Sequence, residues 1–370
     1  MTVIFDQIII IGVGLIGGSL GMAIRKHKLA NQVVGIDLDA QSLTIAKDLG
    51  AVDIYDTGYT AVGDADLVIL AAPIFSNLRI LESICEYLPS KAIVTDVGST
   101  KSEFVAQAEQ LLAGRNAFIG GHPMAGAETA GVSGSDPYLF ENAIYLLTPT
   151  EYTDQNALTK VKAMVEQIGA RTMVVDPTTH DLVVAAISHL PHLVAAALVQ
   201  TVAQVDAENP ITLALAAGGF KDTTRIASGN PGLWKDICFS NKQQIIDMIA
   251  IFQANLTELQ QALVADLKQE FEQSLGQAKM TRDKIPAKLK GYWPFLDEII
   301  VTIPDRPGMI GQVAVILGQD GINIDDIEIL RVREGEGGTL RLGFAKEGSA
   351  KKAVQALGKH GFSARMKVID

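Results

Sequence analysis

Residues 7–23, QIIIIGVGLIGGSLGMA, decide the fold of the first half of the chain, because they predict a strand, a glycine turn and a helix in succession. The four isoleucines at 8–11 are typical of a strand that is covered on both faces. The glycines that follow fit G-x-G-x-x-G, in which one closes a tight turn, one admits a pyrophosphate and one packs helix against strand. The helix N-terminus adds amide donors and partial positive charge. We therefore predict a dinucleotide site formed by Gly12, Gly14, Leu15, Ile16 and Gly17.

A carboxylate follows the second predicted strand, residues 32–36. Asp37 comes 20 residues after Gly17, where its side chain can accept hydrogen bonds from both ribose hydroxyls and would repel a 2′-phosphate. The sequence therefore predicts NAD rather than NADP. The alternative is a tight connection that binds no ligand. Asp39 precedes the helical run 40–49 and is better placed as its N-cap.

Composition and cysteine usage exclude several functional classes. A length of 370 residues predicts two or three domains. The net charge of −11 argues against a nucleic-acid partner, and it means that an anionic substrate would need local cations. Cys85 and Cys238 form neither a metal-binding nor a disulfide pattern, so we expect no metal and two buried thiols in a reducing cytoplasm.

Apolar residues make up 48 % of the chain, which suggests that an apolar surface is buried between subunits. The most apolar window, residues 183–203, contains His189, Pro191 and His192. We therefore interpret it as a buried helix rather than a membrane span.

Strands and helices are predicted in alternation as far as residue 176, which is the rhythm of a Rossmann-type, doubly wound α/β sheet. The strands start near residues 7, 32, 67, 92, 117, 143 and 172. An all-helical, Ala- and Leu-rich region follows, and the last residues predict the order βαββαβ of a ferredoxin-like module. We place the three domains at 1–176, 177–290 and 296–370.

The carboxyl ends of the strands are the places to search for ligand contacts. Residues 67–70 run into Ala72 and Pro73, where small residues would let a cofactor lie close to the backbone. His122 lies in the Gly-rich stretch 120–126 at a neighbouring strand end, and we expect a loop whose backbone geometry holds this side chain. Both loop bracing and catalysis remain open for His122.

Ser99 lies between the predicted strand 93–97 and a helix. Thr100 and Glu103 fit a capping box for that helix, which would leave the Ser99 hydroxyl free to face the cleft. A local hydrogen bond to the backbone is the alternative role for this serine.

The motif S-H-L-P-H at 188–192 interrupts the helical region. Pro191 cannot donate to the carbonyl of Ile187, so we expect a kink that brings His189 and His192 to one face. No carboxylate or cysteine completes a metal site there, so hydrogen bonding of Ser188 or His192 to substrate or cofactor is preferred.

Two cations, Lys221 and Arg225, follow in a weakly helical stretch. Arg225 could pair with Asp222 on the surface, a contact worth about 0.3–0.5 kcal/mol. The functional alternative is a guanidinium fork presented to a substrate carboxylate.

Five motifs in this order resemble the prephenate/arogenate dehydrogenase family of tyrosine biosynthesis. They are GVGLIGGS at 12–19, DVGSTK at 96–101, GGHPMAG at 120–126, SHLPH at 188–192 and FKDTTRIASGNPGLW at 220–234. DRPGMI at 305–310 with GINI at 321–324 resembles an ACT domain, a module that binds small ligands. The resemblance covers nearly the whole chain. It implies NAD-dependent oxidative decarboxylation of prephenate to 4-hydroxyphenylpyruvate.

The resemblance also implies roles for individual residues. His122 matches the catalytic histidine, which bonds the ring hydroxyl of the substrate, and Ser99 matches the serine beside it. Arg225 matches the arginine that binds a substrate carboxylate, and we assign the neighbouring Lys221 to substrate binding as well.

Three further positions follow from the same resemblance. Ser188 and His192 match substrate- and cofactor-side positions, and Trp234 matches an aromatic residue near the subunit boundary of the site. His189 is carried over only as a brace for the kink. The family implies a homodimer whose subunits intertwine their helical domains.

The ACT-like module suggests regulation by an amino acid, and the pathway suggests tyrosine. Pro307 suits the first position of a helix, and Gly308 beside it lets a ligand approach the backbone. The alternative is a module that only assembles subunits. We predict the effector contacts as Asp305, Arg306, Gly308, Asn323 and Ile324.

Rival functions stay open at this point. Arogenate could replace prephenate as the substrate. A β-hydroxyacid dehydrogenase would share the Rossmann domain but would need a lysine base and would leave GGHPMAG unexplained. A non-catalytic sensor of NAD and an amino acid would predict degraded site residues, whereas Ser99, His122 and Arg225 are all present.

Overall fold

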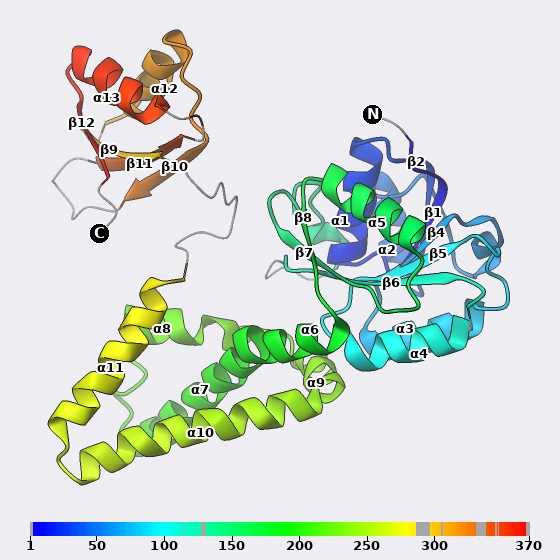
Figure 1. Cartoon of the computed structure of the whole chain (residues 1–370), viewed down its shortest axis with the longest axis horizontal. Helices are drawn as coiled ribbons and strands as arrows, with labels where there is room; N and C mark the ends of the chain where they lie inside the picture. The colour runs from blue at the N-terminus through cyan, green and yellow to red at the C-terminus, as the bar shows by residue number, and fades with distance from the viewer. Residues whose placement is uncertain are drawn as a thin grey trace. The chain divides into compact units, whose positions relative to one another are not determined.

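The structure is a computed structural model that describes residues 3–112, 114–126, 131–285, 297–304, 306–330, 338–344, 346 and 348–367. The chain falls into two compact units, Met1–Lys290 and Gly291–Asp370, and each is described by itself. Figure 1 shows the elements of both.

An eight-stranded sheet forms the centre of the first unit, in the order β3-β2-β1-β4-β5-β6-β7-β8. All neighbours are parallel except β6 and β7, which are antiparallel. The Rossmann-type sheet is therefore confirmed, and the short edge strand β3 is an addition that the sequence did not predict. The strands are β1 Phe5–Ile11, β2 Ala30–Ile36, β3 Ile54–Asp56, β4 Leu67–Leu70, β5 Ile93–Asp96, β6 Ala117–Pro123, β7 Ile144–Thr148 and β8 Arg171–Val174.

Helices cover both faces of this sheet (Figure 1). Ile8 and Ile10 of β1 belong to the core under α1, α2 and α5, whereas Ile9 and Ile11 belong to the core under α3 and α4. At most 3 % of each isoleucine is exposed. Burying such a side chain contributes about 1.5–3 kcal/mol, which explains the uninterrupted apolar run. The helices are α1 Leu15–Lys26, α2 Ala40–Asp48, α3 Ile74–Ile84, α4 Ser102–Leu112 and α5 Gln155–Gln167, with short 3₁₀ turns at η1 Thr60–Asp64 and η2 Val132–Gly134.

The rest of the first unit is helical. It comprises α6 Pro177–Val184, η3 Ala185–His189, α7 Leu190–Glu208, α8 Gly218–Thr224, η4 Arg225–Ser228, α9 Pro231–Ser240, α10 Lys242–Val264 and α11 Lys268–Asp283. The irregularity expected at Pro191 is a π-helical segment, η3, in which the Leu190 N–H bonds to the Ala185 carbonyl. Proline removes one regular helical bond, and π-bulges are a common local solution.

The helix Pro177–Glu208 is long and apolar enough to cross a membrane by length and composition. Only 28 % of its most apolar window is buried within the chain. The expectation of a buried helix is therefore wrong for the single chain, because its neighbouring helices cover only a narrow stripe of it.

The second unit has the expected order βαββαβ. Its antiparallel sheet runs β10-β11-β9-β12. One face packs on α12 and α13 through an apolar core that includes Ile299, Val301 and Leu342. The elements are β9 Asp297–Ile303, α12 Met309–Gln319, β10 Asp326–Leu330, β11 Gly338–Phe344, α13 Ser349–Lys359 and β12 Ser363–Met366.

Helix α12 begins two residues later than expected. Its N-cap is Gly308, whose φ of +90° is in the left-handed region, so Pro307 lies before the cap and the prediction that it occupies the first helical position is wrong. A glycine adopts this conformation without steric cost.

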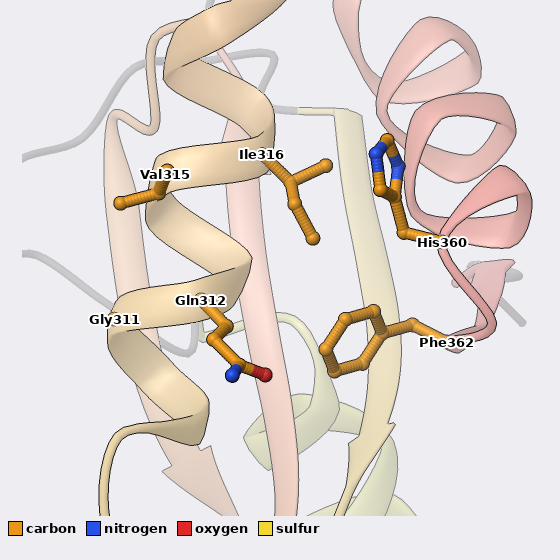
Figure 2. Close-up of a pocket in the computed structure, with 6 residues that line it drawn as sticks. All are labelled: Gly311, Gln312, Val315, Ile316, His360 and Phe362. Atoms are coloured by element: carbon orange, nitrogen blue, oxygen red, sulfur yellow. The ribbon is translucent and has the colours of Figure 1, made fainter.

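A hollow of about 480 Å³ lies on the helical face of the second unit (Figure 2). Side chains from α12 and from the end of α13 point into it, and the lining residues are Gly311, Gln312, Val315, Ile316, His360 and Phe362. None of the four predicted effector contacts that the structure describes lines this hollow.

Candidate active site

The glycine turn follows β1 directly, and each glycine has its own steric reason. Gly12 has φ +98°, and a Cβ there would lie 2.6 Å from the Ala71 carbonyl carbon. A Cβ on Gly17 would lie 1.9 Å from the Gly12 oxygen. A Cβ on Gly14 would meet no described atom within 4 Å. Gly12 and Gly17 are therefore required by packing, whereas Gly14 borders open space into which a ligand could come close. Leu15 and Ile16 begin α1 and are half-buried.

Asp37 stands at the end of β2, beside this turn. Its Oδ2 accepts the Val13 N–H at 2.9 Å and its Oδ1 accepts the Asp39 N–H at 3.0 Å. Asp39 caps α2 by accepting from the N–H groups of Gln41 and Ser42, which confirms the expected N-cap. The hydrogen bond from Ser42 is the main cause that lowers the pKa of Asp39.

The turn that follows β4 packs against the glycine turn that follows β1. A Cβ on Gly12 would lie 2.7 Å from the Ala72 nitrogen, so Ala72 and Gly12 are neighbours. The Ala72 N–H donates to Oδ1 of the buried Asn77 at 3.1 Å. Pro73 is exposed and occupies the N-cap position of α3 without a side-chain hydrogen bond.

His122 lies inside β6, where it pairs with Leu146 of β7. The expected loop is therefore wrong, because the antiparallel partner β7 extends the strand to Pro123. The His122 Nδ1 lies 2.9 Å from Nε2 of His180. Burial lowers the pKa of His122 well below its usual value, and the neighbouring His180, Lys101 and His189 lower it further.

His180 and Asp181 form part of this site, although the sequence analysis did not identify them. The His180 Nδ1 lies 2.8 Å from Oδ1 of Asp181. The same carboxylate accepts the N–H groups of Lys101 and Ser102 at 2.8 Å each, at the start of α4. The only local signal was a histidine next to an aspartate at the start of a helix.

Asp181, rather than Thr100, therefore caps α4. Thr100 instead donates its hydroxyl to Ser240 Oγ at 2.9 Å, so the predicted capping box is wrong. A charged carboxylate that accepts from two amides outcompetes a neutral hydroxyl. Ser99 remains half-buried on the turn between β5 and α4.

A buried ion pair joins Lys101 to Asp96, and both side chains are fully inaccessible. The Asp96 carboxylate also accepts the Gly98 N–H at 2.8 Å and the Gly121 N–H at 3.0 Å. Asp96 therefore ties the end of β5 to the residue before His122. The positive charge of the Lys101 ammonium lowers the pKa of His122. Lys101 acts through its charge, because its side chain makes no hydrogen bond to either histidine among those that the structure shows.

A second group of side chains surrounds Trp234. Its ring stacks on His192, with centroids 3.5 Å apart, and lies edge-on to His189. Burial lowers the pKa of His189 to about 4, and burial also lowers the pKa of His192. Asn241 connects the two groups, since its Nδ2 donates to the Asp181 carbonyl at 2.8 Å and lies 3.3 Å from the His189 Nδ1.

The structure thus joins His122, His192 and Trp234 through a continuous series of contacts, with Ser188 half-buried in η3. Within the described residues, Nδ1 of His192 is buried and has no hydrogen-bond partner. Lys221 and Arg225 lie on α8 and η4 with exposed side chains, and both elements pack along α7.

The predicted effector residues lie in the second unit. Arg306, Gly308 and Asn323 are exposed, and Ile324 is half-buried. The Asn323 amide donates to Asp325 Oδ1 at 2.7 Å. Asp305 lies outside the described residues.

Comparison with known proteins shows the family. The prephenate dehydrogenase nucleotide-binding domain model matches residues 20–174, the prephenate dehydrogenase dimerization domain model matches 176–277 and the ACT domain model matches 298–360. Prephenate dehydrogenase of Bacillus subtilis is 36 % identical over 354 residues, which cover 95 % of each chain. The chain belongs to the prephenate dehydrogenase family.

Two solved structures of relatives match about three quarters of this chain. Prephenate dehydrogenase from Aquifex aeolicus, in complex with hydroxyphenyl propionate and NAD⁺, is 35 % identical with a TM-score of 0.72, and the match covers 76 % of this chain and 98 % of that one. Arogenate dehydrogenase from Synechocystis is also 35 % identical, with a TM-score of 0.67 and coverage of 75 % and 99 %. Family membership therefore leaves prephenate and arogenate both to be considered as substrates.

The two contrasting glycines provide a matched test of the nucleotide site. We expect Gly17→Ala to lower the free energy of unfolding by about 1–3 kcal/mol, because the added methyl group meets the backbone. We expect Gly14→Ala to melt like the native protein but to bind dinucleotide at least tenfold more weakly, a difference of about 1.4 kcal/mol. Thermal unfolding and a cofactor titration by fluorescence measure the two effects. Unchanged affinity in Gly14→Ala would contradict this location of the nucleotide.

Proposed function

We propose that this chain catalyses the NAD-dependent oxidative decarboxylation of prephenate to 4-hydroxyphenylpyruvate in tyrosine biosynthesis. The observation that carries the proposal is the half-buried imidazole of His122 at the end of the contacts that run through His180 to Asp181, with its pKa held well below the usual value by desolvation and by neighbouring groups. A neutral imidazole can take up the proton of a substrate hydroxyl. The match to the Bacillus subtilis enzyme over 95 % of both chains supports prephenate as that substrate.

The reaction requires few groups from the protein. Prephenate carries a hydroxyl at C4 and a carboxylate at C1 of a cyclohexadiene ring. NAD, when bound, would accept the hydride that leaves C4. His122 accepts the hydroxyl proton, with Ser99 beside the same hydroxyl. Loss of carbon dioxide from C1 then leaves an aromatic phenolate, which takes the proton back to become the hydroxyl of the product. Because aromatisation supplies the driving force, the protein needs only to orient C4, accept a proton and hold the anionic groups.

The residues at the glycine turn fit NAD. Gly14 leaves room for a pyrophosphate, and Ala72 lies against the same turn. The Asp37 carboxylate is held at the end of β2 by two backbone amides. Each carboxylate oxygen retains a lone pair for a ribose hydroxyl, and the negative charge disfavours the 2′-phosphate of NADP.

The anionic groups of the substrate need cations, because the chain carries a net charge of −11. We assign Arg225 to a substrate carboxylate through its bidentate fork and Lys221 to the same end of the substrate. Ser188 and His192 complete the contacts along α7.

We assign the uncovered apolar surface of the helical region to a homodimer. Large apolar side chains stay exposed along these helices, among them Ile187, Val205, Phe239, Ile246, Ile251, Leu256, Leu263 and Leu275. The model that matches this region is that of a dimerization domain. A second copy would cover these side chains and place Trp234 near the subunit boundary.

The second unit is the proposed regulatory module, with tyrosine as its effector. The ACT model matches it, and Gly308 opens the backbone before α12 to a ligand. The cytoplasm is the proposed location, because Cys85 and Cys238 are free thiols. The expectation that both cysteines are buried is wrong, because each is half-buried.

Arogenate is the second candidate substrate, favoured by the similarity to the Synechocystis arogenate dehydrogenase. The test measures absorbance at 340 nm with prephenate or arogenate, with NAD or NADP, and with added tyrosine. We expect rapid reduction of NAD with prephenate, suppressed by tyrosine, and slow turnover with NADP. Turnover of arogenate alone would select the second candidate, and turnover of neither compound would contradict both.

His122→Asn tests the general base. We expect kcat to fall by about 10²–10⁴-fold, the usual effect of removing a positioned base, with KM for prephenate little changed. In the native enzyme, kcat/KM should stay flat from pH 7 to pH 6 and fall only at lower pH, because the pKa of His122 is held well below its usual value and protonation removes the lone pair. The acid limb should be absent in the variant. A fully active His122→Asn enzyme would exclude this role.

Arg225→Ala tests the carboxylate contact. We expect KM for prephenate to rise at least tenfold while kcat changes less, because a hydrogen bond to a charged group is worth about 1.5–3 kcal/mol. Lys268→Ala removes an equally charged side chain that is 86 % exposed on the same helical region, and it serves as the control. An unchanged KM in Arg225→Ala would return Arg225 to a surface role.

A further inference from the structure

The proposed base is the end of a buried chain of hydrogen bonds that no sequence motif marked. Nδ1 of His122 contacts Nε2 of His180 at 2.9 Å, and Nδ1 of His180 contacts Oδ1 of Asp181 at 2.8 Å. His180 and Asp181 are each only 1 % exposed. The hydrogen-bonded series therefore runs from the half-buried His122 on β6 into the buried start of α6.

The protons along this chain can be placed by elimination. Burial raises the pKa of Asp181, but hydrogen bonds from His180, Ser102 and Lys101 outweigh it, and the net pKa is lowered. Asp181 is therefore an ionised carboxylate that can only accept. The Nδ1 of His180 must then donate to it, and with a single proton on the ring its Nε2 carries a lone pair.

The same reasoning extends to the base. Since Nε2 of His180 accepts, Nδ1 of His122 must donate, and the remaining lone pair of neutral His122 lies on Nε2. With one proton on each ring, an unprotonated Nδ1 of His122 would face the lone pair on Nε2 of His180. If His180 instead carried its proton on Nε2, its Nδ1 lone pair would face the Asp181 carboxylate. Both contacts are repulsive in a buried site.

We infer that His180 and Asp181 are positioning residues that fix the proton of His122 on Nδ1 and so present Nε2 as the base. This inference rests on the proposed function for its catalytic meaning, although the proton placement can be measured without any substrate. Such control of a tautomer by the partner of the other ring nitrogen is a general property of histidine.

The start of α4 prevents the chain from rearranging. Both oxygens of Asp181 accept backbone amides there, from Lys101 and Ser102, and the Asp181 carbonyl accepts the Asn241 amide. The partial positive charge of a helix N-terminus also favours the ionised carboxylate. The carboxylate is therefore fixed in position and charge before any substrate arrives.

The charges around the chain favour the same state. His122 faces His180 from α6, Lys101 from the start of α4 and His189 from η3, and all three lower its pKa. When His122 takes a proton on Nε2 during turnover, its Nδ1–H keeps its hydrogen bond to His180, and His180 keeps its hydrogen bond to the Asp181 carboxylate.

Three variants test this inference. Glutamine can place an amide oxygen near the position of the His180 Nε2, so we expect His180→Gln to keep kcat within about threefold. His180→Phe offers no acceptor, so its kcat should fall by about 10–100-fold, the usual range for a group that orients a catalytic ligand. In Asp181→Asn an amide N–H faces His180, which reverses both tautomers. We expect a still larger loss of kcat there, with KM little changed in all three.

The direct measurement is ¹⁵N NMR of the histidine rings. The protein has only six histidines, so their signals can be assigned one by one. The two ring nitrogens of His122, assigned with His122→Asn, should appear protonated at Nδ1 and unprotonated at Nε2. His180→Gln should keep this pattern, His180→Phe should mix it and Asp181→Asn should reverse it. Thermal unfolding checks that each variant is folded.

The outcomes separate this inference from the proposed function. A native His122 that is protonated at Nε2 would overturn the inference whatever the substrate. An unchanged His122 pattern in both His180→Phe and Asp181→Asn would overturn it as well, because His180 and Asp181 would then be structural only. The expected spectra without turnover of prephenate or arogenate would support the inference and contradict the proposed reaction.

Discussion

The carboxylate of Asp181 is the interaction on which the rest of the site depends. It is a buried charge, and burying a charge costs several kcal/mol unless hydrogen bonds and opposite charge compensate it. Here the compensation comes from two amides at the start of α4 and from the imidazole of His180. One group therefore holds the helical region against the sheet, caps α4 and orients the histidine that contacts His122.

A second buried carboxylate, Asp96, acts on the other side of His122. It is neutralised by Lys101 and it bonds the amide of the residue before His122. Lys101 lies at the start of α4 and contacts both carboxylates, Asp96 through its ammonium and Asp181 through its backbone N–H. Asp96 and Asp181 therefore both hold the start of α4 in place. The ammonium of Lys101 adds to burial in lowering the pKa of the His122 imidazole. A neutral imidazole is the form that a proton acceptor requires.

The two units separate their tasks. The first unit contains the nucleotide turn, the histidine chain and the uncovered apolar helices, so that the proposed chemistry and the proposed subunit contact share one core. The second unit has its own apolar core between one sheet face and two helices. The continuous helix through α6, η3 and α7 connects the two tasks of the first unit. It carries His180 and Asp181 near its start, His192 at its middle and exposed apolar side chains such as Val205 farther along.

The amino-acid sequence by itself determined those features that depend on neighbouring residues. The isoleucine run, the glycine turn, Asp37 and the Asp39 cap were predictable because dihedral preferences, periodicity and short-range hydrogen bonds specify them. The order βαββαβ of the second unit was predictable for the same reason. His122 and Ser99 were found as candidates because they lie close to the ends of predicted strands, where ligands of such sheets bind.

Tertiary structure alone decided how these residues are connected. His122 and His180 are 58 residues apart, and Lys101 and Asp181 are 80 residues apart, so no local pattern announces either contact. Thr100 was expected to cap α4 because it is the nearest candidate, but packing of α6 brought a charged competitor. His122 was expected in a loop because glycines surround it, but β7 offered an antiparallel partner. In each case a local preference worth about 1 kcal/mol was overruled by a buried partner supplied by the fold.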